Sequence, residues 1–373
     1  QKEIMRANLV ATLVLLVHAA TPSQSQPSSS APSPSFTIVT YMSSDVGEGY
    51  GIHTKAINTE YAKRHGYTFI VHETDDGRGG RDVRWNKVAA VREAMQNMEA
   101  GTGGAVMWMD ADAVITNFDK AAHELLDQAA PAQDLLICRD LSVPREKPTC
   151  APVCLNTGTF ILRNTEWSRR FLDRWWQSAN EHPDLAFGGS HEEAALARLY
   201  STGWEGIRDK TNVFGATAFN SAPPFLADHP ADQLVLHASG EPSAVRSLVF
   251  GHIAQSLSSP AGASSTGLSL YMASLLPELS SLVRRGYEDA HAEDPNDPKV
   301  MTVLASLVRD SGEAGSLGRA GGLLKRAMEA TPEDANAAVT YGAFAAQYMG
   351  EWCGARDAFM AAMRLQPGAE TTA

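Results

Sequence analysis

Apolar and polar positions in residues 36–110 predict strands and helices in alternation. Within this stretch, WNKVAAVREAM (85–95) places Val88, Val91 and Met95 at helical spacing. Three short apolar runs have the length and β-branched content of strands. They are FTIVTYM (36–42), YTFIVHE (67–73) and AVMWMD (105–110). The alternation predicts an α/β fold in which a mostly parallel sheet carries helices on both faces.

A second periodicity appears late in the chain, where small and apolar residues followed by a proline recur. The copies are Val283, Tyr287, Ala290 and Pro295; Ala320, Leu324, Ala327 and Pro332; and Ala355, Phe359, Ala362 and Pro367. Small residues let paired helices approach closely, and the proline closes the second helix. The spacing resembles tetratricopeptide repeats over roughly residues 275–367. A generic helical extension is the alternative.

The start of the chain has the pattern of a targeting segment. Lys2 and Arg6 precede an apolar run, which is typical of a secretory signal peptide or a signal-anchor; a frayed N-terminal helix is the alternative. A Pro- and Ser-rich stretch follows and predicts a stem with no core. The predicted segments are a signal or anchor (1–20), a stem (21–35), the α/β domain (36–255), a linker (256–267) and helical repeats (268–373).

The composition limits the classes of partner. The chain has 373 residues, of which 44% are hydrophobic and 20% charged, as in ordinary globular proteins. Its net charge of −12 argues against nucleic acid as a partner, because phosphate binding needs a basic surface. No stretch is long enough to be a confident membrane span.

Four cysteines are present, and three of them lie in one Pro-containing segment: Cys138, Cys150 and Cys154. In an oxidising compartment we expect one disulfide among these three. A Cys150–Cys154 bond closes a very short loop, and pairing with Cys138 is the less strained alternative. We expect Cys353, on a repeat helix, to be a buried thiol. The spacing does not match a zinc site.

Asp110 and Asp112 stand where the third predicted strand ends. In open α/β sheets, ligands bind beyond the carboxyl ends of the strands, so both acids are expected to face a binding crevice. Carboxylate oxygens suit Mg²⁺ or Mn²⁺, and such an ion can carry a diphosphate. The alternative is a solvated strand end without a function.

Four segments together carry a family resemblance. They are DVGEGYGIHTKAINTEYAKRHGY, WNKVAAVREAM, MWMDADAVITN and LNTGTFILRNTEWSRRFLDRWW. They occur in the order seen in the galactosyl/xylosyl/mannosyltransferases of glycosyltransferase family 34, and LVLHASG resembles the histidine–glycine motif of that family. The resemblance covers about residues 36–250. It implies a GT-A fold with a Rossmann-like mixed sheet, a UDP- or GDP-sugar donor, a glycan acceptor, Mn²⁺ (or Mg²⁺), retention of configuration, and a place in the Golgi lumen.

The resemblance also implies roles for single residues. Asp112 is expected to coordinate the metal directly, and Asp110 to contact the donor ribose or a metal-bound water. His237 is the expected remaining protein ligand of the metal. Lys87 is expected near the donor diphosphate or sugar, and Asn156 is expected to hydrogen-bond the donor sugar or the acceptor.

The chain departs from the family pattern at two places. Where relatives carry an acidic pair followed by glutamine, this chain has His191, Glu192 and Glu193. Glu192 and Glu193 are the expected catalytic residues with Asn156, and Glu193 is either a nucleophile or a cation stabiliser. The Cys-Lys that follows the histidine–glycine in plant members is missing, and Arg246 is the candidate to replace its diphosphate contact.

Each of these residues also has an ordinary structural interpretation. Taken alone, His237 is more often a packed histidine, Lys87 a solvated helix residue, and Asn156 a turn residue beside glycine. Three functions therefore stay open: a luminal glycosyltransferase, a tetratricopeptide adaptor with a degenerate transferase domain, and a metal-dependent phosphohydrolase. The hydrolase lacks the additional Asp and His clusters that would hold two metals.

Overall fold

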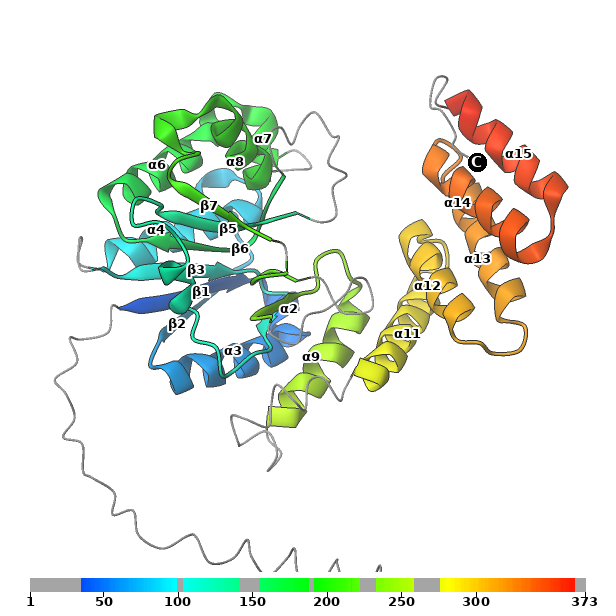
Figure 1. The fold of residues 1–373 in the computed structure, drawn as a ribbon, viewed down its shortest axis with the longest axis horizontal. Helices are drawn as coiled ribbons and strands as arrows, with labels where there is room; N and C mark the ends of the chain where they lie inside the picture. The colour runs from blue at the N-terminus through cyan, green and yellow to red at the C-terminus, as the bar shows by residue number, and fades with distance from the viewer. Residues whose placement is uncertain are drawn as a thin grey trace, which may run out of the picture. The chain divides into compact units, whose positions relative to one another are not determined.

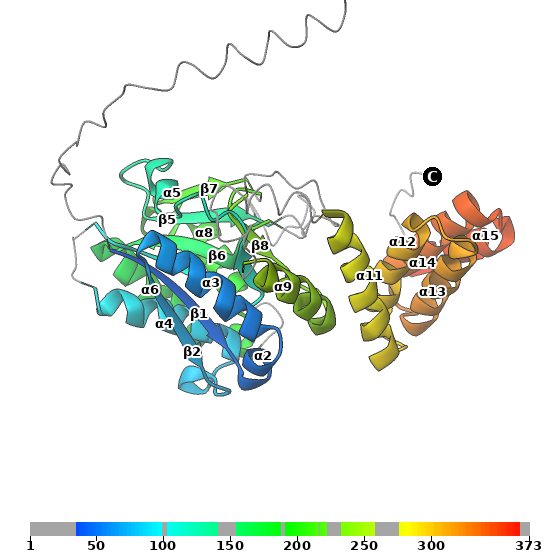
Figure 2. The same ribbon diagram turned by 90° about the horizontal axis from the view of Figure 1, so that it is seen from below.

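A central β-sheet with helices on both faces forms the first part of the molecule, and a group of helices follows it in the chain (Figures 1 and 2). The computed structural model describes residues 35–98, 103–140, 154–187, 191–215, 217–221, 233–257 and 276–365. The predicted signal and nearly all of the predicted stem (1–34), and most of the predicted linker (258–267), lie outside the described residues.

The main sheet has six strands in the order β2-β1-β3-β6-β5-β7. Their bounds are β1 Phe36–Met42, β2 Thr68–Glu73, β3 Ala105–Met109, β5 Leu135–Arg139, β6 Leu155–Arg163 and β7 Thr211–Phe214. β1 runs parallel to β2 and β3, as the alternation predicts. β6 runs antiparallel to both β3 and β5, so the sheet is mixed.

The central strand β3 explains why both faces of the sheet are covered. Its five residues are all buried, and successive side chains point to opposite faces. Met107 and Met109 join the core cluster that includes residues of α3 and α9, whereas Val106 and Trp108 join the cluster with α4, α6 and α8. A strand buried on both faces reads as a continuous apolar run, which is the pattern seen in the sequence.

Among the described residues, eight helices flank the sheet, and one of them, α4, is the helix that the spacing in residues 85–95 predicts. Their bounds are α2 Ser44–Glu48, α3 Gly51–His65, α4 Asn86–Gln96, α5 Glu124–Asp127, α6 Glu166–Glu181, α7 Pro183–Phe187, α8 His191–Thr202 and α9 Ser243–Leu257, with 3₁₀ turns at Arg78–Gly80, Val83–Trp85 and Trp204–Gly206. α3 lies on one face of the sheet, and α4, α6 and α8 lie on the other (Figure 1). The expected fold class, a mixed α/β sheet with C-terminal helices, is confirmed.

The C-terminal part consists of helices packed on their neighbours in the chain. Their bounds are α11 Leu276–Glu293, α12 Pro298–Asp310, α13 Ser316–Ala330, α14 Ala335–Phe344, the π-helical turn η5 Ala345–Met349 and α15 Trp352–Leu365. The apolar and small residues of the three copies fall on α11, α13 and α15, whereas Pro295 and Pro332 follow α11 and α13 and Pro367 lies outside the described residues. Ala320 and Ala355 are buried there, and a Cβ on Gly342 would lie 3.1 Å from Phe359, so small residues do bring these helices close. Among the residues described, no helix is both long and apolar enough to cross a membrane.

Contacts between α11 and the segment around α9 cross the predicted boundary between the α/β part and the repeats. The Tyr287 hydroxyl on α11 donates a 2.6 Å hydrogen bond to Glu241, which lies just before α9. Beside it, a Cβ added to Gly286 would lie 2.7 Å from the Val245 Cα, so α11 approaches the start of α9 closely.

The cysteines differ from the expectation at two positions. Cys154 is in a disulfide, as predicted for one member of the segment. Cys138 carries a free thiol buried in β5, so the prediction of a disulfide with Cys138, the less strained alternative, is wrong. Cys353 is exposed rather than buried, because it stands in the first turn of α15 on a side that none of the described helices covers. Cys150 lies outside the described residues.

Candidate active site

Asp110 is fixed at the carboxyl end of β3 by its backbone and by its side chain. Its N–H donates to Gly158 O at 2.8 Å, which extends the pairing of β3 with β6 by one residue. Its Oδ1 accepts a 2.7 Å hydrogen bond from the Trp108 indole. The chain then turns, and Ala113 N donates back to Asp110 O at 3.0 Å. Asp110 therefore points from the sheet edge as the sequence predicts.

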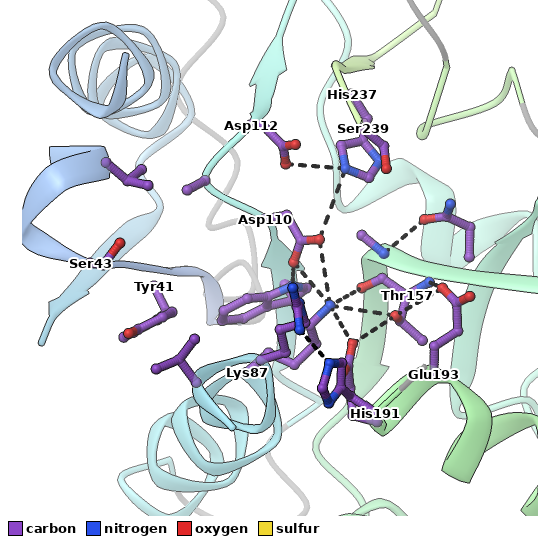
Figure 3. A pocket seen from close by; sticks show the side chains of 18 of the residues that line it. Tyr41, Ser43, Lys87, Asp110, Asp112, Thr157, His191, Glu193, His237 and Ser239 are labelled. Atoms are coloured by element: carbon purple, nitrogen blue, oxygen red, sulfur yellow. Dashed lines mark hydrogen bonds and ion pairs between the residues drawn. The ribbon is translucent and has the colours of Figure 1, made fainter. Parts of the chain in front are cut away.

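A short second sheet brings His237 to Asp112. β4 (Ala113–Ile115) pairs antiparallel with β8 (Val235–His237), with Ala113 opposite His237. His237 Nε2 lies 3.2 Å from Asp112 Oδ1 and 3.9 Å from Asp110 Oδ2 (Figure 3). Each of the three side chains offers an atom, and these atoms lie within 4.8 Å of one another. Two carboxylate oxygens and one imidazole nitrogen form a donor set that fits Mn²⁺ or Mg²⁺.

The three groups share a buried, charged environment. Burial alone would raise the pKa of Asp112, but His237 and then Arg246 outweigh it and hold that pKa well below its usual range. Burial would lower the pKa of His237, but the carboxylates of Asp112 and Asp110 raise it above its ordinary value. Burial raises the pKa of Asp110 although Lys87 and His237 oppose that shift. The Asp112 carboxylate and the His237 ring therefore stabilise each other's charged forms.

Arg246, at the start of α9, lies on the other side of Asp112. Its Nη2 is 2.7 Å from Asp112 Oδ2, and its Nε donates to Ala238 O at 3.1 Å. Its guanidinium lies over the Tyr50 ring, 5.1 Å from the centroid. Because Ala238 follows His237 directly, Arg246 ties the histidine loop to the aspartate loop.

Lys87 is not a solvated helix residue. It lies in the first turn of α4 with its side chain 8% exposed, and its Nζ is 2.8 Å from Glu192 Oε1 and 3.1 Å from Asp110 Oδ1. It also donates to Thr157 O at 3.3 Å. Burial disfavours the charged form, but the two carboxylates more than compensate and raise the pKa of Lys87. Lys87 thus joins the strand end to α8.

Glu192 and Glu193 lie in the first turn of α8, and both contact Thr157 of β6. The Thr157 hydroxyl lies 3.2 Å from Glu192 Oε1, and the Thr157 N–H donates to Glu193 Oε2 at 3.3 Å (Figure 3). Burial raises the pKa of Glu193 more than this hydrogen bond lowers it. His191, which precedes them, has a φ of 36°, a backbone conformation that is rare outside glycine.

Asn156 is part of the strand β6 and not of a turn, which corrects the structural interpretation given above. Its Oδ1 accepts from Gly158 N and from Asn220 Nδ2, each at 2.8 Å. Asn220 Oδ1 is in turn 2.8 Å from His237 Nδ1. Sequence reasoning missed Asn220 and Thr157, because only the folding of distant segments brings them to the site.

These residues line a cavity of about 620 Å³ at the carboxyl ends of β1 and β3. A volume of this size suits a ligand the size of a nucleotide or a sugar nucleotide. All seven residues predicted from the sequence line it: Lys87, Asp110, Asp112, Asn156, Glu192, Glu193 and His237. Arg246 lines it as well.

The mixed sheet and the acidic site at its edge define a GT-A-type α/β domain. The sequence model of the galactosyl transferase GMA12/MNN10 family matches residues 38–149 and 149–225, and the chain belongs to this family. The matched residues include Asp110 and Asp112, whereas His237 lies beyond them.

Curated relatives carry related names. The chain is 27% identical over 197 residues to the probable α-1,6-mannosyltransferase MNN10 of Saccharomyces cerevisiae (strain ATCC 204508 / S288c), a match that covers 48% of each protein. It is 34% identical over 109 residues to probable glycosyltransferase 6 of Oryza sativa subsp. indica, covering 28% of this chain and 20% of the relative. The chain thus spans about half or less of the length of these relatives. A solved glycosyltransferase involved in the glycosylation of the major capsid of PBCV-1 is 20% identical, with a TM-score of 0.47, over 59% of this chain and 100% of the other.

Proposed function

We propose that this protein is a retaining glycosyltransferase that moves a hexose or a pentose from a UDP- or GDP-sugar to a glycan acceptor with Mn²⁺. The observation that carries the proposal is the meeting of Asp110, Asp112 and His237 at the edge of a cavity, in a chain that belongs to this family. Bound there, Mn²⁺ would neutralise charge on the donor diphosphate and stabilise the departing nucleoside diphosphate.

The protein groups around that position have separate proposed roles. Arg246 already contacts Asp112 and supplies the positive charge that the missing Cys-Lys would give, so it is proposed to bind the diphosphate. Lys87 has three ammonium hydrogens and faces Asp110, Glu192 and Thr157, which supports a role in orienting Glu192 at the donor sugar. The Asn156 side-chain oxygen already accepts hydrogen bonds from Gly158 N and Asn220 Nδ2. The Asn156 amide N–H₂ is therefore the group proposed to contact the sugar or the acceptor.

Glu193 is the proposed catalytic carboxylate. Glu192 is held against Lys87 with its side chain 5% exposed, whereas Glu193 accepts hydrogen bonds from Thr157 alone among the described residues and lines the cavity. As a nucleophile, a Glu193 oxygen would attack the anomeric carbon while the bond to the diphosphate oxygen breaks with its electron pair. The acceptor hydroxyl would then displace Glu193 as a carboxylate and give its proton to an oxygen of the departed diphosphate, and two inversions give retention. As a stabiliser, Glu193 would only balance positive charge at that carbon.

The remaining parts of the chain have proposed roles as well. The C-terminal helices are proposed to be tetratricopeptide-like repeats that offer a surface to a protein partner, which the burial of the periodic small residues supports. The Golgi lumen is the proposed location, by type II anchor or cleaved signal. The adaptor alternative predicts no metal-dependent nucleotide binding. Within the described residues, one cluster of three potential metal ligands is found, which disfavours a two-metal hydrolase.

The test is calorimetric titration of UDP and GDP, followed by a panel of their sugars, with Mn²⁺ and with EDTA. Wild type is expected to bind one nucleotide only with Mn²⁺ and to hydrolyse its sugar slowly. His237→Ala and Asp112→Ala are expected to lose this binding. Asp119→Asn, a change at an exposed aspartate near β4, is the matched control and is expected to bind as wild type.

The outcomes separate the candidate functions. Equal nucleotide affinity with Mn²⁺ and with EDTA would contradict the proposed transferase site. For Glu193→Gln, preserved turnover indicates a stabiliser, and lost turnover with intact donor binding indicates a nucleophile.

A further inference from the structure

Asn220 is a buried residue that contacts the proposed metal ligand His237 from behind. It is 7% exposed, His237 is 5% exposed, and Asn220 Oδ1 lies 2.8 Å from His237 Nδ1. The backbone holds Asn220 in place, because the next residue, Ser221, donates to Val235 O at 3.1 Å and accepts from His237 N at 2.8 Å. Asn220 is thus attached to β8, the strand that carries the histidine.

The direction of each hydrogen bond in this group follows from one backbone N–H. Gly158 N–H can only donate, so the Asn156 atom that it meets at 2.8 Å is the amide oxygen. That oxygen can only accept, so the Asn220 atom 2.8 Å from it is the amide nitrogen. Asn220 therefore turns its oxygen to His237, and His237 Nδ1 must carry the hydrogen.

A ring with its hydrogen on Nδ1 has its lone pair on Nε2 when the ring is neutral. Nε2 is the atom that faces Asp112 Oδ1 at 3.2 Å and Asp110 Oδ2 at 3.9 Å. The wrong tautomer would present an N–H at that position and repel a cation. The Asn156–Asn220 relay thus selects the form of His237 that can bind a metal.

We infer that Asn220 is a positioning residue that fixes the tautomer and the ring orientation of His237 and so sets the affinity of the site for a divalent cation. This inference rests on the proposed function, since it takes His237 as a metal ligand. Partners that hold a ligating histidine through its other nitrogen typically account for roughly 10–100-fold of metal affinity.

Binding of Mn²⁺ alone, measured from the free-ion signal in electron paramagnetic resonance, tests the magnitude. Asn220→Ala is expected to weaken Mn²⁺ binding roughly 10–100-fold. Asn220→Asp keeps an acceptor for Nδ1 but loses the donor to Asn156 Oδ1, so it is expected to recover part of the loss, which a purely structural role would not do. Asn212→Ala, on β7, is the matched control and is expected to bind Mn²⁺ as wild type.

Nitrogen-15 NMR of the EDTA-treated protein tests the tautomer without any metal. At a pH where His237 is neutral, wild type is expected to show a protonated Nδ1, and Asn220→Ala to show a mixture of tautomers. A protonated Nε2 in wild type would overturn the inference, as would an Asn220→Ala protein that binds Mn²⁺ as tightly as wild type. If wild type binds no Mn²⁺, the proposed metal site fails, and the tautomer result still decides the role of Asn220.

Discussion

Gly158 is the position where the smallest substitution should disturb the proposed site most. It lies in β6, directly beneath the His237 ring, and a Cβ built on it would overlap His237 Cε1. The same Cβ would lie 2.6 Å from His237 Nδ1 and 2.9 Å from Asn156 Oδ1. Gly158 has no positive φ, so Gly158→Ala adds a steric contact without backbone strain.

The size of the effect follows from these distances. An ordinary contact needs at least 3.4 Å, so the His237 ring must retreat by about 0.8 Å at Nδ1 and about 1.4 Å at Cε1. Both shifts exceed the tolerance of about 0.2 Å for a metal–ligand distance. We expect Mn²⁺ affinity to fall at least about 10-fold. Overpacking costs about 1–3 kcal/mol of unfolding free energy, and the loss of a flexible glycine from the unfolded chain offsets about 0.4–1 kcal/mol. A net loss of about 1–2 kcal/mol is expected.

Both quantities are measurable on the same samples, with Mn²⁺ titration for affinity and urea denaturation for stability. Gly215→Ala is the matched control, because no atom of the described residues, its chain neighbours aside, lies within 4 Å of a Cβ at that position. It is expected to leave Mn²⁺ affinity unchanged. A folded Gly158→Ala protein with the Mn²⁺ affinity of wild type would refute the argument, since it would mean that His237 does not reach the metal.

Three further predictions concern charge, pH and thiol chemistry. Lys87→Met leaves the Glu192 carboxylate buried without its partner, so the free energy of unfolding is expected to fall by about 3–5 kcal/mol in urea denaturation. Burial raises the pKa of the Glu241 carboxyl group above 4.5, and the hydrogen bond from Tyr287 lowers that pKa by a smaller amount. The folded protein therefore binds a proton at Glu241 more tightly than the unfolded chain does. Stability is therefore expected to decrease as the pH rises from 4.5 through the raised pKa, and Glu241→Gln is expected to flatten that part of the pH profile of unfolding. A thiol reagent is expected to modify exposed Cys353 in the folded protein, and the buried thiol of β5 only after unfolding.

Each of these predictions has a control and a contradicting result. For the ion pair, adding Glu192→Gln to Lys87→Met should recover part of the stability, and a loss below about 1 kcal/mol for the single variant would contradict a buried pair. For the pH profile, Tyr287→Phe keeps the carboxylate but removes the hydrogen bond that lowers its pKa, so the slope should persist and extend to higher pH. An unchanged slope in Glu241→Gln would show that another group causes it. For the thiols, Cys353→Ser should abolish the fast reaction, and a second fast thiol would show that the strand cysteine is accessible.

Much of the fold is readable from local pattern. The run that ends at Asp110 has five consecutive apolar residues, which a strand buried on both faces requires, and helical spacing marks α4. The periodic small residues near Ala320 and Ala355 likewise mark helices that pack closely. These features depend on neighbours within a few turns or one strand, so the sequence alone determines them.

The direction of β6 and the exposure of Cys353 did not follow from such patterns. A strand has the same alternation of side chains whether it runs parallel or antiparallel, so only its pairing with β3 decides that the sheet is mixed. Cys353 stands at a small position of a helix, but its burial depends on whether another helix covers that side, and none of the described residues does.

The residues of the candidate site also fall into those that local sequence determines and those that only the tertiary structure brings together. Asp110 and Asp112 follow from a strand end, and the family resemblance supplied His237, which residue pattern alone would leave as a packed histidine. Only the register of β4 with β8 brings His237 to Asp112, and only folding joins Lys87 to Glu192 and Asn220 to His237. Local periodicity determines which face of an element is buried. Contacts between distant segments depend on strand register and on room for the side chains that meet, such as the room that Gly158 leaves for the His237 ring. These are properties of the folded chain as a whole.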